Sequence, residues 1–234
     1  MSKVFQVAAV LGGLTLATAA SAAPVIYNNS IPAGTAAFST TVTGAGGTVQ
    51  TQVLGGLASG NTWVTPAFTI TSTDGSTRPI DTTYLSPYGD AIGINPVAPA
   101  AGSGLTFTFN APVNAFGLMV GDWATCCYLP SELLISFDGG ATRTVASAFS
   151  SNDNPGIPAG DGYRNFVAAI DTSAKFTTVT FYGNGFGEYL VAGGTIYYAD
   201  LAIGSVNGVP VPGAVALMAV GLLGLGAATR RKAA

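Results

Sequence analysis

Short runs of alternating apolar and polar residues fill most of the chain between Pro24 and about Val206. In Leu105–Phe109 the apolar side chains are two residues apart, which places them on one face of an extended strand. Gly, Pro, Asn and Asp separate the runs, and no apolar pattern with a 3.6-residue period reaches the length of a helix. The pattern predicts an all-β fold of two packed antiparallel sheets. The expected strands are Ala37–Val42, Val49–Val53, Phe68–Thr71, Ala91–Ile94, Leu105–Phe109, Ala115–Val120, Glu132–Phe137, Arg143–Ala148, Asn165–Ile170, Thr177–Phe181 and Thr195–Ile203.

Turn residues between the runs support this interpretation. Asp138-Gly139-Gly140 predicts a hairpin, because glycine accepts the positive φ that tight β-turns require. Asn110–Pro112 and Asn154–Gly156 predict loops rather than strand interiors. The less regular stretch Thr73–Pro99 is expected to be an insertion over one sheet.

Residues 1–22 have the order of a secretory signal peptide. Lys3 precedes the apolar run Val7–Leu16, and small residues follow up to Ala22. We therefore expect a signal helix that signal peptidase removes after Ala22. A buried N-terminal helix is the alternative, which Gly12-Gly13 within the run disfavour.

The opposite end of the chain carries a second apolar segment. Gly213–Ala228 has 16 residues, which would extend about 24 Å as a helix, a little less than the ~30 Å hydrocarbon core of a bilayer. The basic residues Arg230, Arg231 and Lys232 follow it and would stay on the cytoplasmic side. The sequence therefore predicts a C-terminal transmembrane helix, with residues 23–206 exported as one β-sandwich domain.

The last residues resemble the PEP-CTERM sorting tail of exported Gram-negative proteins. The shared features are Pro210 and Pro212, a Gly- and Leu-rich helix and the terminal basic cluster. The family motif is Val-Pro-Glu-Pro, whereas this chain has Val209, Pro210, Val211 and Pro212, so Val211 replaces the glutamate. The resemblance implies a tail at 207–234 that holds the protein in the membrane until an exosortase cleaves it. The product is released or attached at the cell surface, often together with exopolysaccharide production. A plain C-terminal membrane anchor is the alternative.

The segment Gly104–Ile203 resembles the bodies of many proteins that carry such tails. The resemblance rests on Phe107–Val113, Ala115–Asp122, Ile135–Gly140 and Tyr198–Leu201. It implies a jelly-roll-like sandwich similar to carbohydrate-binding modules.

Composition excludes several function classes. The chain has no histidine, which removes Ser-His-Asp and Cys-His nucleophile systems and every metal site with a His ligand. All 11 acidic residues fall between Asp74 and Asp200, a segment with only four basic residues, so nucleic acid is not an expected partner. Divalent cations are more suitable partners for this negative charge.

Asp122, Trp123 and Tyr128 form the candidate ligand-binding site. A carboxylate accepts hydrogen bonds from sugar hydroxyls or binds Ca²⁺, and an indole stacks on the apolar face of a sugar. The sequence therefore predicts a lectin-like site, for which Ca²⁺ is a possible cofactor. In the alternative interpretation, Trp123 is only the edge of the core.

Cys126 and Cys127 are adjacent and are the only cysteines. They could form a strained vicinal disulfide, pair with another molecule or stay as free thiols. Oxygen donors also cluster in Ser150–Gly162 and at Asp74, but they lack the spacing of a dedicated calcium loop. A solvated turn is expected there, and no metal site is predicted.

Few residues could support catalysis. Glu132 and Glu188 are the only glutamates, and a glycosidase would need such a pair across one cleft. Lys175 has no serine motif around it. We therefore expect a protein that is not an enzyme, with a structural or adhesive role at the cell surface or in the extracellular matrix, linked to exopolysaccharide. A carbohydrate-binding module is the alternative, and a glycoside hydrolase is a third hypothesis.

Overall fold

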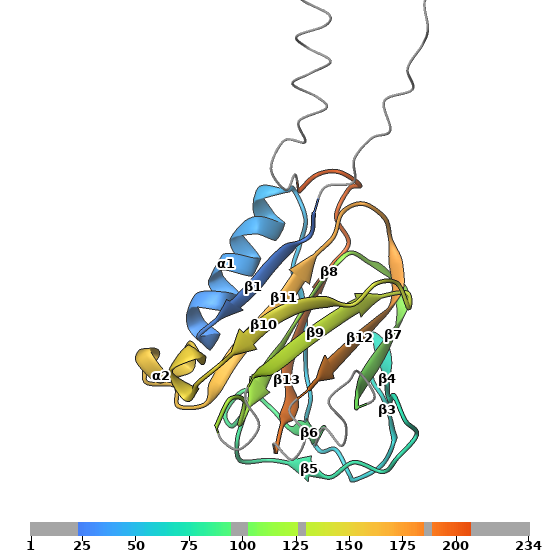
Figure 1. Cartoon of the computed structure of the whole chain (residues 1–234). Helices are drawn as coiled ribbons and strands as arrows, with labels where there is room; N and C mark the ends of the chain where they lie inside the picture. The colour runs from blue at the N-terminus through green and yellow to red at the C-terminus, as the bar shows by residue number, and fades with distance from the viewer. Residues whose placement is uncertain (1–22, 95–102, 126–129, 185–188, 207–234) are drawn as a thin grey trace, which may run out of the picture. The chain divides into compact units, whose positions relative to one another are not determined.

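The computed structural model describes residues 23–94, 103–125, 130–184 and 189–206, which form two antiparallel sheets with a helix on the outside of one of them (Figure 1). The predicted all-β sandwich is therefore confirmed. The predicted helices within residues 1–22 and 207–234 lie outside the described residues. Within the described part of the chain, no helix combines the length and the apolar character needed to cross a membrane. In chain order the elements are β1 (Val25–Asn29), α1 (Ile31–Gly44), β2 (Gln50–Val53), β3 (Thr62–Val64), β4 (Phe68–Ser72), β5 (Ile80–Asp81), β6 (Ala91–Gly93), β7 (Gly104–Val113), β8 (Ala115–Gly121), β9 (Ser131–Phe137), β10 (Arg143–Ala148), a 3₁₀ turn (Ser151–Asp153), α2 (Gly156–Ala159), β11 (Arg164–Ile170), β12 (Phe176–Gly183) and β13 (Val191–Ala199).

Every strand pair in the two sheets is antiparallel. The seven-stranded sheet has the order β1-β11-β8-β13-β6-β5, with β2 also paired to β13, and the six-stranded sheet has the order β10-β9-β12-β7-β4-β3. Along β13, β6 pairs with Val191–Gly193 and β2 pairs with Thr195–Tyr198. Gly193 ends the first stretch and Gly194 lies between the two, with φ values of 144° and 64° that suit glycine far better than any other residue. Strand β6 thus pairs with β13, and β5 forms this edge of the seven-stranded sheet.

Aromatic side chains fill the space between the sheets. Phe107 of β7 and Phe116 of β8 belong to different sheets, and their ring centroids lie 4.9 Å apart. The predicted alternation of Leu105–Phe109 holds, because its three apolar residues are buried while Thr108 is exposed. Burying each such ring contributes about 1.5–3 kcal/mol. This core holds the strands in place and so sets the positions of the loops that connect them.

Helix α1 replaces a strand that the sequence pattern predicted. Ala37–Val42 lies within α1 and is not extended. The helix was missed because its residues are mostly Ala, Gly, Ser and Thr, whose short apolar runs do not separate helix from strand. A helical signal is nevertheless present: Ser30 and Pro32 stand at its start, and its buried residues have helical spacing. These buried residues are Ile31, Gly34, Phe38 and Val42.

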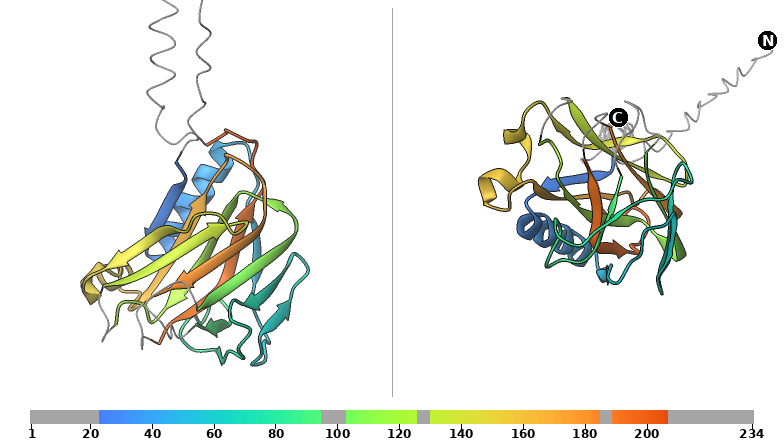
Figure 2. Two further views of the ribbon diagram at one scale, coloured as in Figure 1. Left: turned by 45° about the vertical axis from the view of Figure 1, so that its right-hand side comes forward. Right: turned by 90° about the horizontal axis from the view of Figure 1, so that it is seen from below.

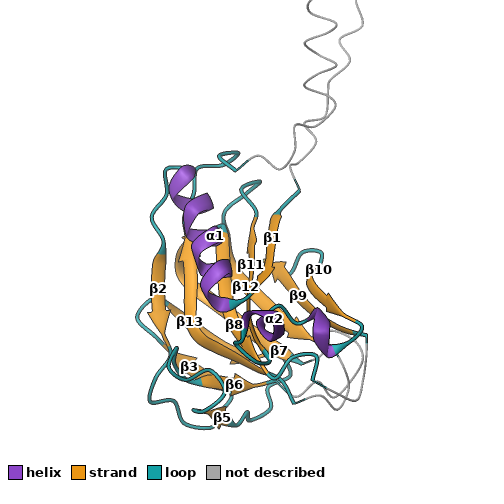
Figure 3. Cartoon of the chain, turned by 90° about the vertical axis from the view of Figure 1, so that its left-hand side faces the viewer, coloured by secondary structure: helices purple, strands orange, loops and turns teal. Residues whose placement is uncertain are grey.

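The central strands β8 and β11 of the seven-stranded sheet are consequently buried on both faces. Helix α1 packs against β1, β11 and β8 (Figure 3). The Phe38 ring lies edge-on to the rings of Tyr27 and Phe166, at 6.0 and 5.9 Å between centroids. Gly34 permits this approach, because a Cβ there would come within 2.7 Å of the Phe166 ring. Figure 2 shows α1 on the outer side of the strands.

The other local predictions have mixed outcomes. Asp138-Gly139-Gly140 joins β9 to β10 as predicted, with positive φ at Asp138 and Gly139. Asn110–Pro112 was expected to be a loop but lies inside β7, where the pairing with β12 shifts register. Asn154–Gly156 lies in the connection between β10 and β11, as predicted. The described part of Thr73–Pro99 carries β5 and β6, and its Leu85 packs on the outer face of the seven-stranded sheet. Strands β1, β3 and β5 were not predicted.

The two ends of the sandwich differ in what they carry. Val25 pairs with Ile170, and Thr172 donates a hydrogen bond from Oγ1 to the Val206 carbonyl, so Val25 and Val206 lie at the same end of the sandwich. We call this the terminal end. Strand β8 runs from there to Gly121, which pairs with Arg164 and Val191. We call the end marked by Gly121 the distal end.

Candidate functional site

Asp122 stands at the distal end, directly after the last residue of β8. Its backbone is left-handed, with φ of 58°, and so is that of Ala124, with φ of 63°. A Cβ on Gly121 would lie 2.9 Å from Val191 and 3.3 Å from both Leu85 and Tyr84. The chain therefore turns at Asp122, next to Tyr84 and Leu85 of the β5–β6 segment, and this turn fixes the direction of the Asp122 side chain.

Trp123 is a core residue and not the exposed platform that the sequence suggested. Its side chain is fully buried in the core between the sheets. The indole Nε1 donates to Ser131 Oγ at 3.1 Å, and Asn154 Nδ2 donates to the Trp123 carbonyl at 2.8 Å. Because both ring faces are packed, the indole cannot stack on a sugar in this structure. This corrects the lectin-like role expected for Trp123.

Two tyrosines that the sequence analysis did not single out lie beside Asp122. Tyr84 comes from the β5–β6 segment and Tyr189 precedes β13. Their ring centroids are 6.2 Å apart with an interplanar angle of 44°, and each side chain is 37% exposed. Two half-exposed aromatic rings thus lie next to a carboxylate. Only the tertiary fold brings them together, so no local sequence signal could have identified them.

The electrostatics of this group are unusual for surface side chains. Burial, together with a hydrogen bond to Asp122 and the negative charge of that residue, raises the pKa of Tyr84 to about 12. Burial also raises the pKa of Asp122, and the charge of Asp81 adds to this, although hydrogen bonds from Tyr84 and Thr125 act in the opposite direction. Burial and the charges of Asp81 and Asp122 raise the pKa of Tyr189. The four side chains therefore form one interacting group.

Asp81 holds the β5–β6 segment in place. Its Oδ1 accepts hydrogen bonds from the backbone nitrogens of Thr83 and Tyr84, at 2.8 and 2.6 Å. This turn positions the Tyr84 ring against Tyr189. We refer to Asp81, Tyr84, Asp122 and Tyr189 as the distal cluster.

Several predicted site residues lie outside the described residues. They are Cys126, Cys127, Tyr128 and Glu188, and the sorting-motif residues Val209, Pro210, Val211, Pro212, Arg230, Arg231 and Lys232. The state of the two cysteines therefore stays open. Within the described ranges, no group of three or more His, Cys, Asp or Glu residues is placed to hold a metal ion.

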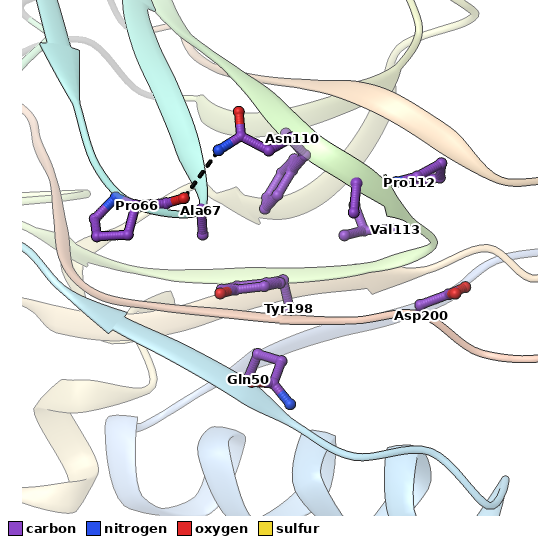
Figure 4. Close-up of a pocket in the computed structure, with 10 residues that line it drawn as sticks. Gln50, Pro66, Ala67, Asn110, Pro112, Val113, Tyr198 and Asp200 are labelled. Atoms are coloured by element: carbon purple, nitrogen blue, oxygen red, sulfur yellow. Dashed lines mark hydrogen bonds between the residues drawn. The ribbon is translucent and has the colours of Figure 1, made fainter.

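A pocket of about 340 Å³ opens between the sheets, lined by residues of β2, β7 and β13 and by Pro66 and Ala67 just before β4 (Figure 4). The ring of Tyr198 lies inside it, edge-on to Phe68 and 5.2 Å from Phe109 between centroids. At its rim, Asn110 Nδ2 donates to the Pro66 carbonyl at 2.9 Å. Asp200, also at the rim, pairs with Lys175. The pocket has the size of a small ligand, but its floor is aromatic and the side chains of Asn110 and Asp200 at its rim already have partners within the protein.

The remaining polar candidates are engaged within the protein. Glu132 Oε2 accepts from Asn184 Nδ2 at 3.1 Å, and Asp74 pairs with Arg78 at 2.9 Å. In the loop after β10, Asp153 Oδ2 accepts from two backbone nitrogens, those of Phe149 and Ser150. These contacts indicate structural roles. The expected solvated turn around Ser150 contains a 3₁₀ turn that Asp153 caps.

Comparison with known proteins gives no family for this chain. No model of a known protein family matches it, and no curated protein matches it. Its function is therefore inferred from its own residues.

Proposed function

We propose that the protein is an exported, non-catalytic component of the cell surface or extracellular matrix, with a structural or adhesive role linked to exopolysaccharide. In this proposal the sandwich is jelly-roll-like, signal peptidase cleaves after Ala22, and an exosortase processes the tail at 207–234. The membrane is a transient partner through the C-terminal helix. The acidic body has no role in binding nucleic acid.

The observation that supports the proposal most is the position of the body's two ends. Val25 and Val206 both lie at the terminal end of the sandwich. A body tethered through either end, as the signal-like and tail-like sequences predict, would be attached through its terminal end. The distal cluster would then point away from the attachment. This arrangement suits a protein that presents one end to an extracellular partner.

A carbohydrate-binding module is the second candidate function. The distal cluster favours it, because half-exposed aromatic rings beside carboxylates are suited to sugars. Asp122 keeps its place in this candidate site, whereas Trp123 does not.

Mass spectrometry of the protein isolated from its native host tests the proposal. We expect the mature chain to begin at Ala23 and to end close to Val209–Pro212. Val211→Glu, which restores the family motif, is expected to be processed at least as completely as the natural chain. Pro210→Ala with Pro212→Ala is expected to accumulate uncleaved at the tail. An intact chain that is dissolved inside the cell and uncut at both ends would contradict the proposal.

A further inference from the structure

We propose that Asp81, Tyr84, Asp122 and Tyr189 form a binding site for a pyranose unit of an extracellular polysaccharide. This inference deepens the proposed function by naming a partner and a site, and it depends on that function for the choice of polysaccharide. Four observations support it.

The first is the exposure of the two tyrosine rings. Tyr84 and Tyr189 are each 37% exposed although their ring centroids lie only 6.2 Å apart. Each tyrosine therefore keeps part of its surface open to solvent. The C–H groups of a pyranose present an apolar face that packs on such rings, while the Tyr84 hydroxyl bonds to Asp122.

The second is the presence of uncompensated carboxylates beside the rings. Among the described residues, neither Asp81 nor Asp122 forms an ion pair with Lys or Arg. Arg164 lies on the neighbouring strand, opposite Gly121, but its guanidinium donates to the carbonyls of Asp161 and Ser86. A carboxylate has about four acceptor positions, and the bonds from Tyr84 and Thr125 leave part of those of Asp122 free. Sugar hydroxyls are suitable donors to these positions.

The third is the conformation that holds Asp122. The residue is half-buried with a left-handed backbone, and its charged form is disfavoured there by burial. Left-handed conformations of residues other than glycine, and carboxylates with raised pKa, both concentrate at functional sites. Among the described residues, the hydrogen bonds that lower the pKa of Asp122 come from the side chains of Tyr84 and Thr125.

The fourth is the location of the cluster. It stands at the distal end, where Gly121 marks the end of β8, away from the end that holds Val25 and Val206. A site there would stay accessible in a protein attached through its terminal end.

Affinity measurements on the mature protein purified from its host test this site, with the host's own extracellular polysaccharide as the probe. We expect Tyr84→Ala and Tyr189→Ala each to weaken binding at least tenfold, and Asp122→Asn to weaken it severalfold. Tyr163→Ala is the matched control, because Tyr163 is 38% exposed and precedes β11 at the same end, outside the cluster. Its affinity is expected to equal that of the natural protein.

Circular dichroism and thermal unfolding of each variant show that it is folded. Tyr84→Phe provides a milder change that keeps the ring and removes only the hydroxyl, and it is expected to bind more tightly than Tyr84→Ala. Wild-type protein that does not bind the polysaccharide, or cluster variants that bind like Tyr163→Ala, would overturn the site. This outcome is distinct from that of the processing experiment. A protein with the expected termini that does not bind would contradict the binding site but not the proposed processing. A chain that binds but is not processed would contradict the processing but not the site.

Discussion

Asp122 and Asp138 are the same residue type in the same backbone conformation at opposite ends of the sandwich. Each directly follows a strand, β8 or β9, and each has positive φ, 58° or 46°. For Asp138, at the terminal end, burial is outweighed by hydrogen bonds from Thr178 and Thr177, so its pKa is lowered. For Asp122, at the distal end, burial prevails and the pKa is raised.

The difference separates a structural aspartate from a candidate binding aspartate. Asp138 Oδ1 accepts from the backbone nitrogens of Thr177 and Thr178, at 2.9 and 2.7 Å, and so ties the β9–β10 turn to β12. Asp122 interacts instead with the side chains of Tyr84 and Thr125, among the residues that the structure describes. The first arrangement stabilises the fold, whereas the second disfavours a charge at a place where a ligand could compensate it.

The largest effect is expected for Trp123→Ala. Because the indole is buried between the sheets, its removal should lower the free energy of unfolding by about 3–5 kcal/mol. Urea denaturation measures this loss. Tyr189→Ala at the same end serves as the control, with an expected loss of less than about 1 kcal/mol. A Trp123→Ala protein as stable as the Tyr189→Ala protein would mean that the indole is not a core group.

Asp138→Ala should destabilise the protein by about 1–2 kcal/mol, because the hydrogen bonds to β12 are lost and alanine is strained at positive φ. Asp138→Asn retains an acceptor and should lose less. Since the pKa of Asp138 is lower when folded than its ordinary 3.8, its ionic contribution is complete above pH 3.8 and disappears as the pH falls through the folded value. The stability difference between Asp138→Asn and wild type should therefore narrow in acid, and a constant difference would contradict the lowered pKa.

Asp122→Asn should change the stability in the opposite direction and make the protein more stable. With the folded pKa above 3.8, ionised Asp122 destabilises the native state at neutral pH, and this penalty disappears once the pH falls below 3.8. The variant should be more stable than wild type at pH 7 and equally stable at pH 3, in denaturation experiments at both values. Asparagine also tolerates the left-handed backbone. A loss of stability at pH 7 would indicate that Asp122 is structural after all.

The smallest effect is expected at the terminal end, for Lys175→Gln. Lys175 pairs with Asp200, whose side chain is 62% exposed, and exposed ion pairs contribute only about 0.2–1 kcal/mol. Thermal unfolding in low and high salt should show a small loss that salt reduces further. A loss above about 2 kcal/mol would show that this pair, and not Asp138, holds the terminal end together.

Much of the fold could be predicted from the sequence because strand alternation is a local property. Leu105–Phe109 and Glu132–Phe137 show it clearly, and both lie within strands of the sandwich. Helix α1 was missed because its Ala-, Ser- and Thr-rich composition hides the start signal at Ser30 and Pro32, and its packing on Phe166 and Tyr27 is a tertiary contact.

The site was predicted less well because its residues are far apart in the sequence. Asp122 and Trp123 were chosen because a carboxylate and an indole are suited to a sugar, but side-chain chemistry does not show that the indole is buried in the core. Tyr84 and Tyr189 meet because the β5–β6 segment folds back against β13. No pattern near either residue predicts that contact.

The most direct test of the difference between the two ends is an NMR pH titration of the side-chain carboxyl carbons of Asp122 and Asp138 in one sample. We expect Asp122 to titrate above 3.8 and Asp138 below it. Added polysaccharide should move only the Asp122 titration. Titration of both groups at the same pH, or in the reverse order, would contradict the assignment of a structural aspartate to the terminal end and a binding aspartate to the distal end.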